Sequence, residues 1–179
     1  LSVKDLASKY RKIRKQITDL CKSYEERYTT KTIAAMYKLM VLALESEFEN
    51  ILYRLQFGRL DAGIEAVKEL TTKYYSIASD GNQNIAPTLK RFVVQLESLY
   101  LDALCIEYEY YVQRERAKEE QRAIREQMRQ EAEERKRLEQ ERKKVEAEEN
   151  KYRQEMERIT AQMQSAHDAE LEALKKSLS

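Results

Sequence analysis

The sequence contains few residues that interrupt helices. Its 179 residues include one proline, three glycines and no tryptophan. Proteins use proline at roughly 5% on average, and both proline and glycine favour turns over helix interiors. Their scarcity argues against a β-sandwich or barrel, which needs many turns, and against an α/β enzyme, whose phosphate-binding loops need glycine. The sequence therefore predicts an all-α protein.

Long hydrophobic runs are also missing from the sequence. No run of about 18 apolar residues exists, so no segment is expected to cross a membrane. The sequence shows no signal peptide. It starts at Leu1 rather than at a methionine and ends inside a charged helical pattern. We therefore interpret the chain as a piece of a longer protein.

Charge divides the chain into two parts. In residues 113–179, 34 of 67 residues are charged, with 17 positive and 17 negative side chains, and large apolar residues are sparse. Such a composition cannot bury a globular core, whereas about 100 residues is a common domain size. We predict a compact helical bundle over residues 1–112. Its last helix is expected to continue as a long, highly charged, coiled-coil-like connector over residues 113–179, towards a domain outside the chain.

Apolar residues recur at steps of three and four, which places them on one face of a helix. Helices are predicted near residues 3–28, 31–57, 60–79 and 88–176. Ser2 is expected to cap the first helix, with Asp5 three residues later. Residues 36–44 are apolar nearly all round, which is typical of a buried central helix. The predicted core comprises Ile13, Ile17, Met40, Leu44, Phe48, Ile51, Val67, Leu70, Phe92, Leu96 and Leu99.

Few residues could carry chemistry. The single histidine, His167, stands alone in a charged helix, which leaves no Ser-His-Asp or Cys-His arrangement. Cys21 and Cys105 lie among apolar residues and are expected to be buried, reduced thiols, although their spacing leaves a disulfide open. One acidic cluster spreads around its helix rather than converging on a metal ion, and it comprises Glu45, Glu47 and Glu49. We therefore predict no catalytic residue, metal site or cofactor in this chain.

Three surfaces are candidates for binding. Tyrosines are enriched at interfaces, and one group near the end of the predicted bundle comprises Tyr100, Tyr108, Tyr110 and Tyr111. A second interpretation packs Tyr110 inside and lays the other rings over the end of the bundle. A weak nucleic-acid face, which could equally be a solvated helix surface, comprises Lys9, Arg11, Lys12, Arg14 and Lys15. A candidate coiled-coil seam comprises Leu138, Val145, Tyr152 and Ile159.

The seam is interrupted by charged residues. Glu131, Arg135, Arg142 and Glu149 occupy other seam positions, which weakens a coiled coil. Glutamates four residues ahead of a basic residue support a lone helix equally well. The charged helix could therefore exist alone or as a loose oligomer, and we expect self-association, as a dimer or a higher oligomer.

Four segments resemble one protein family. They are residues 37–40 (YKLM), 80–89 (DGNQNIAPTL), 106–111 (IEYEYY) and 123–129 (AIREQMR). The resemblance is to a bacterial and phage domain of unknown function that lies directly ahead of a GIY-YIG nuclease domain of the T5orf172 type. Some members, the SNIPE-type proteins, are membrane-tethered anti-phage nucleases. Neither a Gly-Ile-Tyr nor a Tyr-Ile-Gly tripeptide occurs in this chain, so no nuclease residue is carried over.

The resemblance implies a non-catalytic connector, sensor and oligomerisation module of a GIY-YIG nuclease, active in phage defence or phage DNA metabolism. The implied partners are a second copy, the downstream nuclease domain and a phage or host membrane-associated protein. The implied location is the cytoplasm, or the inner membrane if the parent carries an anchor outside this chain, as some members do. One alternative is a generic helical adaptor or coiled-coil spacer without a nuclease. A weaker alternative is a DNA-binding module.

Overall fold

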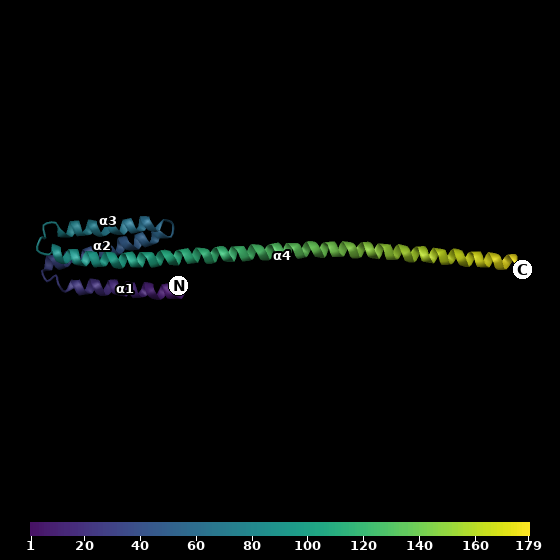
Figure 1. The fold of residues 1–179 in the computed structure, drawn as a ribbon, viewed down its shortest axis with the longest axis horizontal. Coiled ribbons are helices and arrows are strands. Elements are labelled where there is room, and N and C mark those ends of the chain that lie inside the picture. The colour runs from purple at the N-terminus through teal and green to yellow at the C-terminus, as the bar shows by residue number, and fades with distance from the viewer. The chain divides into compact units, whose positions relative to one another are not determined.

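The computed structural model describes all of residues 1–179, and its only regular secondary structure is α-helix (Figure 1). Its elements are α1 (Val3–Glu25), α2 (Lys31–Leu55), α3 (Leu60–Ser79) and α4 (Ala86–Ser177). No strand forms, so the predicted all-α class is confirmed. The helix α4 alone has 92 residues. The chain divides into two units, Leu1–Glu119, here called the bundle, and Glu120–Ser179, here called the charged segment.

The helix ends lie close to their predicted positions. At the start of α1, the Asp5 backbone N–H donates to Ser2 Oγ at 3.1 Å, and the Ser2 N–H donates to Asp5 Oδ2 at 3.3 Å. This reciprocal capping box confirms the predicted cap. Between α3 and α4, Gly81 has φ +73°, a conformation that costs glycine little. The helix α4 begins at Ala86, two residues earlier than predicted, because Pro87 fits within a first helical turn.

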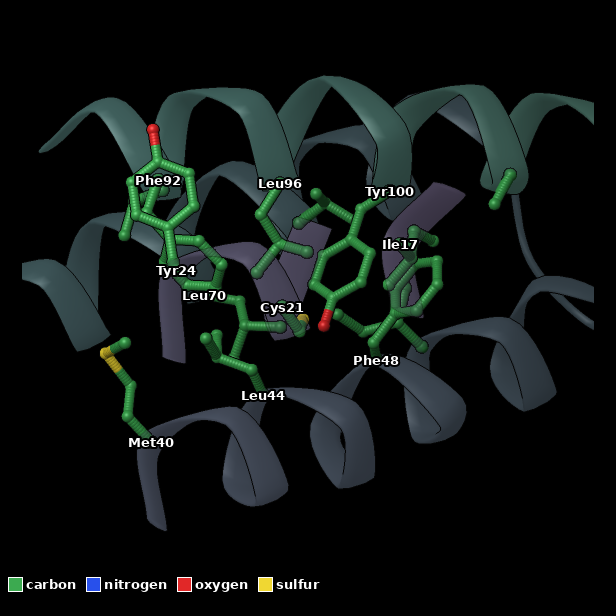
Figure 2. Packing of buried hydrophobic residues seen from close by; sticks show 14 of the residues in the cluster. Ile17, Cys21, Tyr24, Met40, Leu44, Phe48, Leu70, Phe92, Leu96 and Tyr100 are labelled. Atoms are coloured by element: carbon green, nitrogen blue, oxygen red, sulfur yellow. The ribbon is translucent and has the colours of Figure 1, made fainter. Parts of the chain in front are cut away.

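The bundle has one hydrophobic core, built from α1, α2, α3 and the first part of α4 (Figure 2). Its centre includes Phe48 of α2 and Tyr100 of α4, whose rings stack with centroids 3.9 Å apart. Of the eleven predicted core residues, nine are buried. The exceptions, Ile13 and Leu99, are half-buried and pack against the outside of the core. Both residues lie at the edge of the apolar face of their helix. Apolar spacing alone does not tell whether a residue at such an edge is fully buried or only touches the core.

Two buried hydroxyl groups fix helices to one another. Tyr37 on α2 donates from its hydroxyl to the Cys21 carbonyl of α1 at 2.5 Å. Thr71, fully buried on α3, donates to Glu97 Oε2 of α4 at 2.5 Å and lies 3.2 Å from the Val67 carbonyl. A buried polar group is stable only when it is paired, so both bonds specify how the helices meet.

Gly63 lies on α3 against two leucine side chains. A Cβ at this position would lie 3.2 Å from Leu55 Cδ1 and 3.3 Å from Leu104 Cδ2. The glycine therefore makes room for two leucine side chains.

Two sequence-based expectations about burial are wrong. The helix α2 is not covered all round, because Leu39 and Leu42 are 68% and 63% exposed. Both cysteines are free, but only Cys21 is buried, since Cys105 points to solvent from α4. Burial raises the pKa of the Cys21 thiol to about 11. No helix has the length and apolar character needed to cross a membrane.

Candidate protein-contact surfaces

The structure divides the predicted tyrosine surface. Tyr100 is 1% exposed and stacks on Phe48, so it belongs to the core and cannot meet a partner. The sequence carries a signal for this burial, since Tyr100 follows Leu96 by four residues and so lies on the same buried face of α4. Burial raises the pKa of the Tyr100 hydroxyl. The prediction that Tyr100 forms part of a contact surface is therefore wrong.

The remaining tyrosines lie half-buried near the end of the bundle. Tyr108 and Tyr111 pack against the core, whereas Tyr110 does not, which reverses the interpretation that Tyr110 is the inner ring. The rings of Tyr110 and Tyr111 meet edge to face with centroids 5.9 Å apart. Burial, together with Glu107, raises the pKa of Tyr111. Amphipathic rings in such half-buried positions suit a contact surface.

Tyr110 also borders an open groove between α1 and α4. The groove is mostly apolar, with Arg11 and Glu107 among its lining residues. Its walls are formed by Leu6, Ala7, Tyr10, Arg11, Ile106, Glu107 and Tyr110. One helical turn further along α4, Gln113 Nε2 donates to the Leu1 carbonyl at 2.7 Å. The start of α1 and this part of α4 therefore form one surface.

The basic face of α1 is only partly free. Arg14 forms an ion pair with Glu49 of α2, and its guanidinium carbon lies 5.9 Å from the Phe48 ring centroid. This arginine therefore joins α1 to α2 and is not available for phosphate groups. The other members of the face are solvent-exposed and comprise Lys9, Arg11, Lys12 and Lys15.

Two of the three acidic residues of α2 form ion pairs with other helices. Glu49 binds Arg14, and Glu47 Oε1 lies 3.4 Å from Lys73 Nζ of α3. No group of three or more His, Cys, Asp or Glu side chains is placed to hold a metal ion. His167 is exposed in the charged segment.

The seam residues of the charged segment are all uncovered. Every residue from Arg114 to Ser179 is exposed, including the predicted seam residues Leu138, Val145, Tyr152 and Ile159. The local ion pairs also differ from the predicted ones. Arg129 binds Glu126 at 2.5 Å and Glu133 at 3.0 Å. The prediction paired glutamates with basic residues four positions later, and none of these pairs forms. The predicted pairs are Glu131/Arg135, Glu133/Arg137, Glu139/Lys143, Glu149/Arg153 and Glu172/Lys176.

One apolar surface was not predicted. Leu39, Leu42, Tyr53 and Phe57 are exposed, and their spacing places them on one side of α2 and the turn that follows it. The rings of Tyr53 and Phe57 meet edge to face at 5.9 Å. The spacing of residues 39, 42, 53 and 57 indicates a second apolar row on this side of the helix. Our prediction included only the row that faces the core.

Comparison with known proteins adds no relatives. No protein-family model, curated protein or solved structure matches this chain. Its function therefore has to be argued from the surfaces described above.

Proposed function

We propose that this chain is the connector, sensor and self-association module of a longer GIY-YIG nuclease, acting in phage defence or phage DNA metabolism. In this proposal, the bundle receives a signal or a partner, and α4 links it to a nuclease domain beyond Ser179. The chain itself performs no catalysis.

The observation that supports this proposal most directly is the continuity of α4. The same helix contributes Phe92, Leu96 and Tyr100 to the bundle core and then runs on to Ser177. Its charged segment buries nothing within the chain. A helix that begins in a packed core and continues as an exposed segment suits a connector, because the exposed segment needs no core of its own.

The proposed link to this family is supported by the resemblance of the four sequence segments described above. Residues 80–89 form the turn and first residues of α4, and residues 106–111 form the tyrosine-rich edge of the bundle. The groove lined by Tyr10 and Tyr110 is our candidate for the signal-receiving contact.

The parent protein tests the proposal directly. We expect Gly-Ile-Tyr and Tyr-Ile-Gly motifs within a few tens of residues after Ser179, and metal-dependent DNA cleavage by the full-length protein. Purified residues 1–179 should cut no DNA, with or without Mg²⁺. A parent without these motifs would instead indicate a generic helical adaptor, and reproducible nicking by residues 1–179 would contradict a non-catalytic role.

A salt titration tests the DNA-binding alternative. Phosphate contacts make DNA affinity fall steeply with salt. Since Arg14 is engaged with Glu49, we expect weak binding to duplex DNA that disappears at moderate salt. Tight binding that is lost in a Lys12→Glu, Lys15→Glu variant would instead favour a nucleic-acid interface on α1.

A further inference from the structure

The charged segment carries one uninterrupted apolar row. Tyr152, Met156, Ile159 and Met163 follow each other at steps of four, three and four, and all are 45–69% exposed. This is the spacing of consecutive seam positions in a coiled coil. Continued in both directions, the same seam includes Arg142 and Glu149 on one side and Ala166 and Ala173 on the other. A partner for this row must offer apolar residues opposite its centre. The same partner must also accommodate the charged seam residues on either side of the row.

A second copy in parallel orientation meets this need poorly. In register, Arg135, Arg142 and Glu149 would each face the same residue of the other copy. On the flanks of the seam, Glu141 would face Glu146, and the attractive pair of Glu148 with Arg153 offsets only that repulsion and not the like charges within the seam. Like charges at these positions destabilise a coiled coil.

An antiparallel second copy meets the same need well. If Met156 faces Ile159 of the second copy, Tyr152 faces Met163, and the apolar row pairs with itself twice. In the same register, two of the three charges that interrupt the seam face small residues, since Arg142 lies opposite Ala173 and Glu149 opposite Ala166. Small residues leave room for the long charged side chains to bend towards solvent.

The flanking charges agree with this register. Glu141 lies opposite Lys176 of the second copy, and Glu146 lies opposite His167. No flanking position between residues 139 and 176 meets a like charge. Val145 opposite Glu170 is the one unfavourable layer. Flanking charges set partner choice and orientation in coiled coils.

We propose that two copies of this chain pair antiparallel through residues 138–177, with Met156 of each copy opposite Ile159 of the other. This inference deepens the self-association included in the proposed function. It specifies the occupant of the apolar row, its direction and its register. A symmetric two-fold pairing of one surface with itself is the commonest form of homodimer.

Engineered cysteines test the register. In a Cys105→Ser background, buried Cys21 stays unreactive, and single variants Met156→Cys and Ile159→Cys are oxidised alone and as a mixture. We expect the mixture to form a disulfide about tenfold faster than either variant alone, because disulfides need Cα atoms within about 7 Å. Peptide mapping should identify a bond between positions 156 and 159. Gln154→Cys, on the outer side of the helix, is the control and should not cross-link.

Charge reversal tests the direction independently. In the antiparallel pair, Glu141→Lys meets Lys176, so the dimer dissociation constant should rise about tenfold over the two symmetric sites. Lys176→Glu should weaken the dimer similarly, and the double variant should recover the original affinity. In a parallel pair, Glu141→Lys would instead relieve repulsion from Glu146 and tighten the dimer. Glu157→Lys, which lies off the seam, is the matched control.

The outcomes distinguish the proposed antiparallel interface from self-association in general. A dimer in which Met156→Cys cross-links fastest with itself would overturn the antiparallel orientation but leave self-association standing. A dimer that cross-links at none of these positions would overturn the interface. A strict monomer at micromolar concentration, measured by light scattering, would overturn both this inference and the self-association in the proposed function.

Discussion

The bundle and the charged segment use the same apolar spacing with opposite results. In the bundle, apolar side chains recur every three or four residues and 22 of them are buried. In the charged segment, the spacing persists at lower density, and every side chain is exposed. Spacing therefore determines that a segment is helical, and the density of apolar residues determines whether it has a core. This difference predicts how each region responds to the same kind of substitution.

The largest difference is expected from a matched pair of isoleucines. Ile17→Ala removes a buried side chain of α1 and should lower the free energy of unfolding of the bundle by about 2–5 kcal/mol. Ile124→Ala removes an exposed side chain of the charged segment and should change it by less than about 0.5 kcal/mol. Urea unfolding followed by tyrosine fluorescence measures both. Equal effects would show that the charged segment has a core that the structure does not show.

Two threonines give the next difference. Thr71→Val removes the buried hydroxyl that donates to Glu97, and it should cost the bundle about 1–3 kcal/mol because the carboxylate loses its partner. Thr160→Val removes a hydroxyl that donates to the Met156 carbonyl at 2.7 Å in the exposed segment. We expect little change there, because water replaces the bond. Urea titrations under identical conditions compare the free energies of unfolding of the two variants. An unchanged free energy of unfolding in Thr71→Val would contradict the role given to that hydrogen bond.

A smaller effect is expected at the cap of α1. Ser2→Ala should lower stability by about 1 kcal/mol, whereas Ser8→Ala, inside the same helix, should have almost no effect. Hydrogen bonds from the Ser2 side chain and backbone lower the pKa of Asp5 below 3.8. The bonds that the Asp5 carboxylate accepts therefore contribute fully above this value and are lost as the pH falls through the lowered pKa. Thermal melts at pH 7 and at acid pH should show a smaller Ser2→Ala difference in acid, where only the bond from the Asp5 N–H to Ser2 Oγ remains.

The smallest effect is expected from ion pairs in the charged segment. Arg129→Gln removes the pairs with Glu126 and Glu133 and should slightly reduce helix content, measured by circular dichroism. Hydrogen bonding to Arg129 lowers the pKa of Glu126, so this contribution is present at neutral pH and is lost on acidification. High salt should remove the difference. Arg125→Gln, at a position without an ion pair, is the control, and an equal loss there would show that helix propensity is responsible.

Much of the fold could be predicted from the sequence, because its signals are local. The four helices follow from apolar spacing, the Ser2 cap and the turn around Gly81, and most of the core follows from the row that each helix buries. The incorrect predictions concern the burial of single residues, which depends on neighbours that are distant in the sequence. Leu39 and Leu42 are as apolar as Met40 and Leu44, yet no other helix covers their side of α2. Cys105 is exposed for the same reason.

The candidate surfaces were less predictable than the fold. A string of tyrosines identified the end of the bundle but could not separate the buried Tyr100 from the half-buried Tyr110. The basic face of α1 was visible in the sequence, but the pairing of Arg14 with Glu49 joins residues 35 positions apart. In the charged segment several pairings are possible for each charge, so the sequence predicted ion pairs but not their partners.

The hydrogen bond between Gln113 and Leu1 has a mechanical consequence. It closes a loop of 112 residues and places the first residue beside a late turn of α4 in the bundle, while Tyr24 meets Phe92 near the other end. The helices α1 and α4 therefore run in opposite directions. A tension applied between Leu1 and Glu119 would peel these helices apart one turn at a time, starting at that bond, instead of shearing the whole contact at once. The bundle would thus yield to a weak pull while resisting heat and denaturant as a unit.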